Sequence, residues 1–158
     1  MKKILFRISC YLLWCTWGIL DGLYGLIIFL FTFAFAGKIK YQDNIITVKI
    51  GKTYKASGWA FEAGAFVFSN TDAIFDTKNS FFKHEWGHCI PQTWLCGPLH
   101  IFLCGIPSVI RFQYREYLVR SGKKKRSELK LYDAAWFEGT ATKWGTYWNN
   151  KLKEKGWL

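Results

Sequence analysis

Two histidines and a glutamate stand close together near the middle of this 158-residue chain, in the run His84-Glu85-Trp86-Gly87-His88. In a helix of about 3.6 residues per turn, side chains four positions apart lie on one face, so both imidazoles can reach one metal ion. Glu85 lies beside this face, where its carboxylate could accept a proton from a water on the metal. The pattern predicts a helix with a zinc centre for hydrolysis, in which His84 and His88 are ligands and Glu85 is the catalytic base.

A third protein ligand is needed, because a catalytic zinc commonly has three and leaves one position open for water. In the metzincin pattern this ligand would be a histidine at position 94, after a glycine at position 91. The chain has Trp94 and Pro91 there, which excludes that class. His100, the remaining histidine, lies among apolar residues, and we expect it to be buried and hydrogen-bonded rather than a ligand.

Glu138 is the best candidate for the third ligand. With Ala141 and Gly145 it falls at positions i, i+3 and i+7, which places one carboxylate and two small residues on one helix face. Small residues let another helix approach closely. A carboxylate among aromatic neighbours is costly to bury without a partner, and a cation is an obvious one. The alternatives are a surface carboxylate or an ion pair with Lys143.

The sequence before the motif predicts a small amount of β-structure. Residues 38–70 contain a β-branched run at 45–50, then Gly51-Lys52, then a stretch of small and aromatic residues at 59–69. These features predict two short strands around a turn at Gly51-Lys52. The expected fold class is therefore mainly α with a small β-hairpin, an α+β arrangement.

Two helices must bring the proposed ligands together. Polar residues at 72–80 supply loop and N-cap side chains for the helix that carries the motif, and Pro91 should end that helix. Ser127 should cap a last helix that carries Glu138 and continues to Trp148. We expect these two helices to pack against each other.

The N-terminus has the composition of a membrane segment. Residues 8–36 are almost wholly apolar, with Asp21 as the only acid, and exceed the roughly 20 residues that a spanning helix needs. Residues 1–37 are therefore predicted to be an N-terminal membrane segment, either a single helix or a hairpin that turns at Asp21-Gly22. Ala34-Phe35-Ala36 imitates a signal-peptidase site, but the apolar region is much longer than that of a signal peptide.

A second apolar segment, residues 89–110, contains three prolines and is a poor continuous span, so we expect it to dip into the membrane or lie flat on it. The chain has 22 Lys and Arg against 11 Asp and Glu, a formal charge of +11, and eight of these basic residues lie in the run that follows, residues 111–130. This run is either a solvated loop or a contact with anionic lipid at the cytoplasmic face. No nucleic-acid motif is present, and we expect no nucleic-acid partner.

With His84-Glu85-x-x-His88 followed by Glu138, the chain resembles the gluzincin class of zinc metallopeptidases, in which a second helix supplies a glutamate ligand. More narrowly, residues 58–145 are similar to a group of small bacterial membrane proteins that share a set of short motifs. These motifs are His84-Glu85-Trp86-Gly87-His88, Gln92, Gly97-Pro98-Leu99, Gly105-Ile106-Pro107-Ser108, Glu138-x-x-Ala141 and Trp144-Gly145. Two positions depart from the pattern: Gln92 stands one residue later than expected, and Thr142 replaces a frequent aspartate.

The resemblance implies a membrane-bound zinc metallopeptidase in which His84, His88 and Glu138 hold Zn²⁺ and Glu85 activates water toward a peptide bond. Residues 38–158 would form the metallopeptidase-like domain, at the cytoplasmic face of a bacterial inner membrane, with a peptide or protein as substrate. Tyr132 and Tyr147 flank Glu138 and are candidates to stabilise the oxyanion. The alternative is a catalytically silent membrane scaffold, with a structural metal site or none, that docks on anionic lipid.

A site-2-type intramembrane protease is a further option, because Leu20-Asp21-Gly22 matches the short motif that supplies an aspartate ligand in those enzymes. There, however, this motif follows the metal-binding helix, whereas here it precedes it. The order of the elements therefore disfavours this option.

Overall fold

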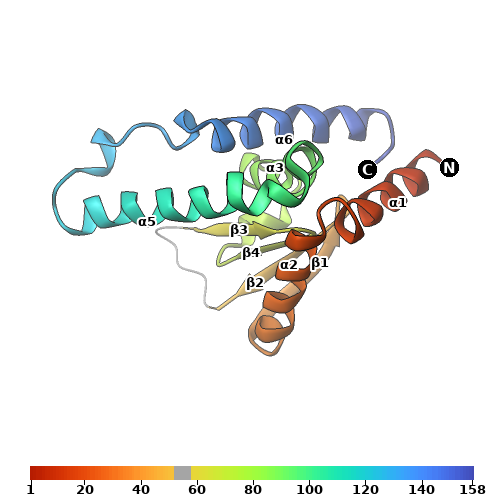
Figure 1. Cartoon of the computed structure of the whole chain (residues 1–158), viewed down its shortest axis with the longest axis horizontal. Coiled ribbons are helices and arrows are strands. Elements are labelled where there is room, and N and C mark those ends of the chain that lie inside the picture. Colours follow the sequence, from red (N-terminus) through yellow and green to blue (C-terminus); the bar gives the residue numbers. More distant parts are fainter. Residues whose placement is uncertain (52–57) are drawn as a thin grey trace.

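The structure is a computed structural model that describes residues 1–51 and 58–158, and these residues form a mixed α+β fold that is mostly helical (Figure 1). The strands are β1 (Ala36–Gln42), β2 (Ile45–Ile50), β3 (Ala60–Ala63) and β4 (Phe66–Ser69). The α-helices are α1 (Lys2–Cys15), α2 (Ile19–Thr32), α3 (Ser80–Gly87), α4 (Thr93–Cys96), α5 (Ile106–Arg120) and α6 (Trp136–Glu154).

The sheet is larger than the single hairpin that the sequence predicts, because it contains two hairpins in the order β1-β2-β4-β3. β1 pairs antiparallel with β2 through a turn at Asp43 and Asn44, whose φ angles of 46° and 65° are in the left-handed region that these residues tolerate. β3 pairs antiparallel with β4, with Gly64 (φ 60°) in the turn.

β2 and β4 are parallel neighbours, which corrects the expectation of a turn directly between two antiparallel strands. Parallel strands require a longer connection than a tight turn. Gly51, at the end of β2, has a positive φ of 71°, and Lys52 lies outside the described residues.

The N-terminal apolar region is bent between α1 and α2, and the two helices meet at an angle of 88°. The break falls at residues 16–18 and not at Asp21-Gly22, which corrects the predicted turn. Asp21 is buried within α2, and Gly22 packs closely on α1, where an added Cβ would lie 2.6 Å from the carbonyl oxygen of Trp14. Gly22 therefore serves helix packing, and neither residue reverses the chain.

The described residues contain no single helix that is long and apolar enough to cross a bilayer. Two bent pairs pass the same test of length and composition when their halves are taken together. These pairs are Lys2–Cys15 with Ile19–Phe35, and Ser80–Leu99 with Ile101–Arg120.

The motif helix α3 begins as expected and ends differently. The side chain of Asn79 caps it by accepting a hydrogen bond of 2.9 Å from the backbone N–H of Phe81. Pro91 does not stop the helical path, because residues His88–Gln92 form a wider π-helical turn that leads into α4. Such a turn accommodates a proline that a regular α-helix would not. The hydroxyl of Thr93 donates to the carbonyl of His88 at 3.1 Å.

The last helix begins at Trp136 and not near Ser127, which corrects the predicted cap. Ser127 lies in a short 3₁₀ turn, Arg126–Glu128, where the Glu128 carboxylate accepts a hydrogen bond of 2.9 Å from the backbone N–H of Lys125. Leu129 and Leu131 are extended, with ψ of 138° and 143°, so the helix cannot continue through them. In Figure 1 the chain returns from the far end of α5 through this region into α6.

α3 and α6 approach each other closely through small residues, as the spacing of Ala141 and Gly145 predicts. A Cβ added to Gly87 of α3 would lie 2.8 Å from the carbonyl carbon of Ala141. A Cβ added to Gly145 would lie 2.9 Å from the Cα of Gly87. Carbon atoms normally pack at about 3.5–4.0 Å, so neither glycine leaves room for a side chain. The contact formed by Gly87, Ala141 and Gly145, called the seam below, sets the separation of the two helices that carry the candidate ligands.

Candidate metal centre

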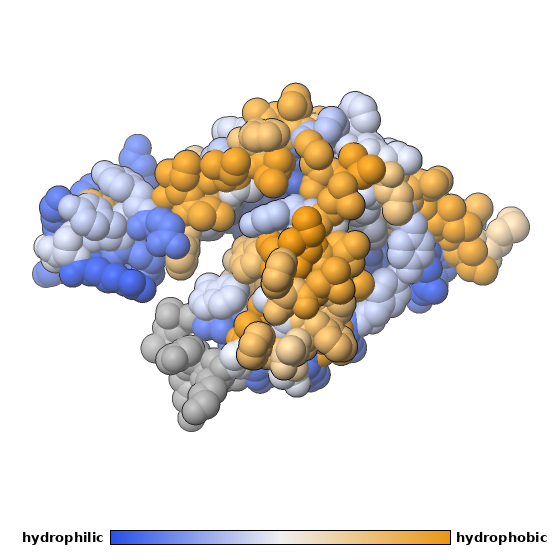
Figure 2. Space-filling view, turned by 60° about the horizontal axis from the view of Figure 1, so that its bottom comes forward, coloured by the Kyte–Doolittle hydropathy of each residue, from blue (hydrophilic) through white to orange (hydrophobic). Residues whose placement is uncertain are grey.

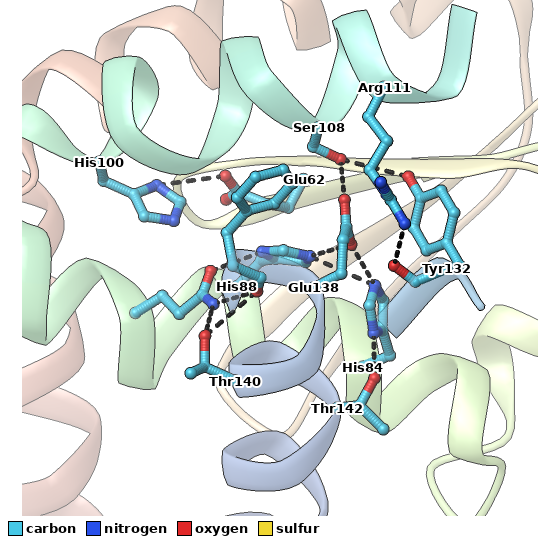
Figure 3. A network of polar contacts seen from close by, with 12 residues as sticks. Glu62, His84, His88, His100, Ser108, Arg111, Tyr132, Glu138, Thr140 and Thr142 are labelled. Carbon is cyan, nitrogen blue, oxygen red and sulfur yellow. Dashed lines mark hydrogen bonds and ion pairs between the residues drawn. The ribbon is translucent and has the colours of Figure 1, made fainter. Parts of the chain in front are cut away.

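The structure brings His84, His88 and Glu138 together at one point between α3 and α6 (Figure 3). The Nε2 atoms of His84 and His88 are 3.2 Å apart. The Oε2 atom of Glu138 lies 3.2 Å from His84 Nε2 and 3.3 Å from His88 Nε2. Tetrahedral ligands at zinc distances of about 2.0–2.1 Å are separated by about 3.3–3.4 Å. The three atoms therefore have the spacing of three corners of a zinc coordination tetrahedron.

The Nδ1 atom of each imidazole, on the side of the ring away from Glu138, contacts a polar side chain that can orient the ring. His88 Nδ1 lies 2.7 Å from the amide oxygen of Gln92. The amide nitrogen of Gln92 donates to the hydroxyl of Thr140 at 2.5 Å and to the carbonyl of Phe137, so the amide oxygen must face the histidine. Nδ1 is then the protonated nitrogen of His88, which leaves Nε2 with the lone pair that a metal requires.

His84 has a similar arrangement with a different partner. Its Nδ1 atom lies 2.7 Å from the hydroxyl of Thr142. A hydroxyl oxygen can accept this hydrogen bond, so Thr142 orients the ring without adding a negative charge. The position of Gln92 is explained as well, because the π-helical turn carries its amide to His88.

Glu138 is fully buried, and Ser108 binds the carboxylate oxygen that faces away from the histidines. The Ser108 hydroxyl donates to Oε1 of Glu138 at 2.5 Å, and the hydroxyl of Tyr132 lies 3.3 Å from Ser108 Oγ. Burial raises the pKa of Glu138, but the adjacent imidazoles of His84 and His88 outweigh burial and hold the pKa well below its usual range. Glu138 is therefore ionised, and Oε2 points to the histidines rather than to Lys143.

Glu85 faces the same space as the three candidate ligands. All four side chains line a cavity of about 770 Å³, and Glu85 is only 5% exposed. Burial raises the pKa of Glu85, while the neighbouring His84 and His88 lower it in part. A carboxylate with a raised pKa, beside a group that can hold water, is suited to accept and return a proton.

The two tyrosine candidates are in different places. Tyr132 lines the cavity, and the centroid of its ring lies 6.4 Å from that of His84. Burial, followed by the charge of Glu138, raises the pKa of Tyr132 to about 12, so its hydroxyl remains a donor at neutral pH. Arg111 fixes this segment by donating to the carbonyl of Tyr132 at 3.0 Å. Tyr147 is 52% exposed and bonds Lys151, so it is not part of the site.

Sequence reasoning missed Ser108 and Arg111 as parts of the site. Ser108 stands within Gly105-Ile106-Pro107-Ser108, which carried only a resemblance and no chemical role. The available signal was a hydroxyl residue just after a proline at the start of α5, and it was too general to assign. His100 is buried and hydrogen-bonded, as expected, and does not belong to the group formed by His84, His88 and Glu138.

Comparison with known proteins adds no family assignment, because no family model, curated protein or solved structure matches the chain. The interpretation of the site therefore rests on its geometry and on the chemistry of its residues.

Proposed function

We propose that this chain is a membrane-bound zinc metallopeptidase in which His84, His88 and Glu138 bind the metal. One observation carries the proposal: three ligand atoms of suitable type lie 3.2–3.3 Å apart, and each imidazole has a hydrogen-bonding partner at its other nitrogen. Ligand spacing alone occurs in ordinary ion pairs. A metal centre typically has imidazoles whose second nitrogen is hydrogen-bonded, as in His84 and His88, and a carboxylate ligand that is itself hydrogen-bonded, as Glu138 is to Ser108.

The side chains around the site supply the remaining functions of a hydrolase. Zinc bound there would act as a Lewis acid and lower the pKa of a bound water to roughly 7. Glu85 would accept the proton as water attacks the carbonyl carbon and would pass it to the leaving nitrogen. The hydroxyl of Tyr132 would donate to the oxygen that becomes negative during the attack.

The cavity favours a peptide as the substrate. β3 is the last strand of the sheet order β1-β2-β4-β3, and its residues line the cavity. Within the part of the chain that the structure describes, no strand pairs with its outer edge. An extended peptide can add to such an edge through backbone hydrogen bonds, which would bring it past Glu85.

The surface supports a position at a membrane. Large apolar side chains are exposed on α1, on α2, on α4 and on the segment from Leu99 to Ile110, and much of the face seen in Figure 2 is hydrophobic. They include Ile4, Leu5, Ile8, Leu12, Leu23, Ile27, Leu30, Phe31, Trp94, Leu95, Leu99, Phe102, Ile106, Val109 and Ile110. Apolar patches this extensive are uncommon on the surface of a soluble monomer. The hydrophilic side chains at the far end of α5 would then contact anionic headgroups.

The test compares zinc content with peptide hydrolysis in detergent-purified protein. We expect at least one zinc per wild-type chain, and one zinc fewer in His84→Ala and in Glu138→Gln. The wild type should also cleave a peptide library, as detected by mass spectrometry. Glu85→Gln should keep the zinc and lose hydrolysis. A zinc content that both ligand variants leave at the wild-type value would overturn the site, and hydrolysis that persists in Glu85→Gln would overturn the catalytic role.

A further inference from the structure

A second cluster of ionisable side chains lies beside the candidate zinc ligands and has no role in the proposed reaction. It consists of Asp21 from α2, Glu62 from β3 and His100 from the segment before α5. His100 Nδ1 lies 2.7 Å from Asp21 Oδ2 and 3.4 Å from Glu62 Oε1. The side chains are 4%, 7% and 0% exposed for Asp21, Glu62 and His100. Figure 3 shows Glu62 and His100 next to His88.

The cluster is not satisfied by its own hydrogen bonds. Within the described residues, Glu62 Oε2 and His100 Nε2 are buried polar atoms without a hydrogen-bonding partner. Buried polar atoms normally have such a partner, and an exception calls for an explanation. Glu62 is the clearer case, because its side chain is more than nine-tenths buried and only one of its oxygens faces His100.

The charge of the cluster is also unbalanced. Two buried carboxylates face one imidazole, which can supply at most one positive charge. No lysine or arginine within the described part of the chain forms an ion pair with Asp21 or Glu62. Removing ionised carboxylates from water is unfavourable unless a nearby charge compensates them. A proton on Glu62 would balance the cluster, and burial together with the charge of Asp21 raises the pKa of Glu62 to about 7 even though His100 lowers it.

A divalent cation would balance the two carboxylates with a neutral His100. The ligand atoms of the three residues already lie within 4.8 Å of one another. Two carboxylates and an imidazole are suitable for Zn²⁺ and Mn²⁺. The hydrogen bond of 2.7 Å between His100 and Asp21 would open to the spacing of two metal ligands, about 3.3 Å for a tetrahedral site.

We propose that Asp21, Glu62 and His100 form a second divalent-cation site in the same cavity as the first. Asp21 and Glu62 line that cavity, and the rings of His88 and His100 are 6.5 Å apart, centroid to centroid. The four buried carboxylates Asp21, Glu62, Glu85 and Glu138 would then be balanced by two cations of charge +2. This cation would also tie α2 to β3 and to the segment before α5. The inference does not depend on peptidase activity.

The experiment is metal analysis after equilibrium dialysis of the full-length, detergent-purified chain against Zn²⁺ and, separately, against Mn²⁺. We expect two ions per wild-type chain with at least one of these metals. His100→Gln should hold one ion, and so should His84→Ala, because each variant removes one site. Glu62→Gln keeps the size and hydrogen-bonding capacity of the side chain, so it tests the site even if His100→Gln does not fold.

Asp133→Asn is the matched control, because Asp133 lines the cavity but is exposed and lies outside both clusters. It should retain two ions. A single ion in the wild type that His84→Ala removes and His100→Gln and Glu62→Gln retain would overturn the second site while leaving the proposed zinc centre intact. A single ion with the opposite dependence would overturn the zinc centre and support the second site. A chain that binds neither Zn²⁺ nor Mn²⁺ would overturn both.

Discussion

Replacing Gly87 with alanine should disable the proposed metal centre without changing any of the candidate ligands. Gly87 lies between His84 and His88 in sequence and faces Ala141 of α6. The added Cβ would lie 2.8 Å from the carbonyl carbon of Ala141, where carbon atoms normally stay about 3.5–4.0 Å apart. To accept the methyl group, α3 and α6 must separate by roughly 1 Å, because backbone on both sides of the contact cannot rotate away.

A separation of this size exceeds what the coordination can absorb. Both histidines move with α3, whereas Glu138 moves with α6, so the distances of 3.2 and 3.3 Å from Glu138 to the histidines would grow. Metal–ligand distances tolerate only about 0.2 Å of error. Loss of a hydrogen-bonding partner of a metal ligand already costs about 10- to 100-fold in metal affinity, and loss of the ligand itself should cost at least as much. The crowding should also destabilise the fold by about 1–3 kcal/mol.

The assay is competition for Zn²⁺ with a chromophoric chelator, accompanied by thermal unfolding of the metal-free protein. Gly105→Ala is the control, because its added Cβ would meet only Ile101 Cγ1, at an ordinary distance of 3.7 Å. We expect Gly87→Ala to remain folded with a lower melting temperature and to bind zinc at the site of His84, His88 and Glu138 at least about 10- to 100-fold more weakly. Gly105→Ala should resemble the wild type. A folded Gly87→Ala protein that binds zinc within twofold of the wild type would refute the argument that the seam sets the ligand geometry.

Three further predictions concern the surroundings of the site and the surface. Thr142→Val removes the partner of His84 Nδ1 at almost constant volume and should weaken zinc binding about 10- to 100-fold; an unchanged affinity in the chelator assay would show that this contact does not orient the ring. In metal-free protein, burial raises the folded-state pKa of Glu62 from 4.5 to about 7, so ionisation of Glu62 opposes folding. The free energy of unfolding should therefore fall as the pH rises between these two values, by at most about 3 kcal/mol. Glu62→Gln should remove that loss in urea unfolding measured from pH 4 to 8, and an equally steep decline in the variant would contradict it. Replacing Lys123, Lys124 and Lys125 with glutamine should weaken sedimentation with phosphatidylserine vesicles and leave the weak sedimentation with phosphatidylcholine vesicles unchanged; equal loss on both would argue against headgroup electrostatics.

The candidate ligands could be predicted because each depends on helical spacing, which is local. His84 and His88 share a face by the four-residue rule, and the face of Glu138, Ala141 and Gly145 follows from the same geometry. Small residues beside a carboxylate indicated that another helix would approach there, and α3 lies at this position. The third candidate ligand, Glu138, was therefore accessible from the sequence even though it lies 50 positions after His88.

The chain reversals were harder to predict, because residues with turn propensity also serve packing. Asp21-Gly22 has the composition of a turn, yet Gly22 is needed where α2 crosses the backbone of Trp14. Asp43 and Asn44 do form a turn, and their signal was overlooked in favour of Gly51. Pro91 has a strong tendency to end an α-helix, but a π-helical turn accommodates it and positions Gln92 against His88. In each case a tertiary contact decided between two uses of the same residue.

The second cluster could not be predicted for a related reason. Asp21 and His100 are 79 residues apart, and Glu62 comes from a strand whose partner in the sheet was not anticipated. None of the three belongs to a motif with metal-ligand spacing, so only the fold brings them together. The correction of the N-terminal turn and the inference of a second cation site are linked: Asp21 can face His100 because α2 continues through it. If Asp21 were the turn of a hairpin, its carboxylate would have no reason to be buried. Its burial beside Glu62, one of whose carboxylate oxygens has no hydrogen-bonding partner within the described residues, is the feature that a bound cation explains.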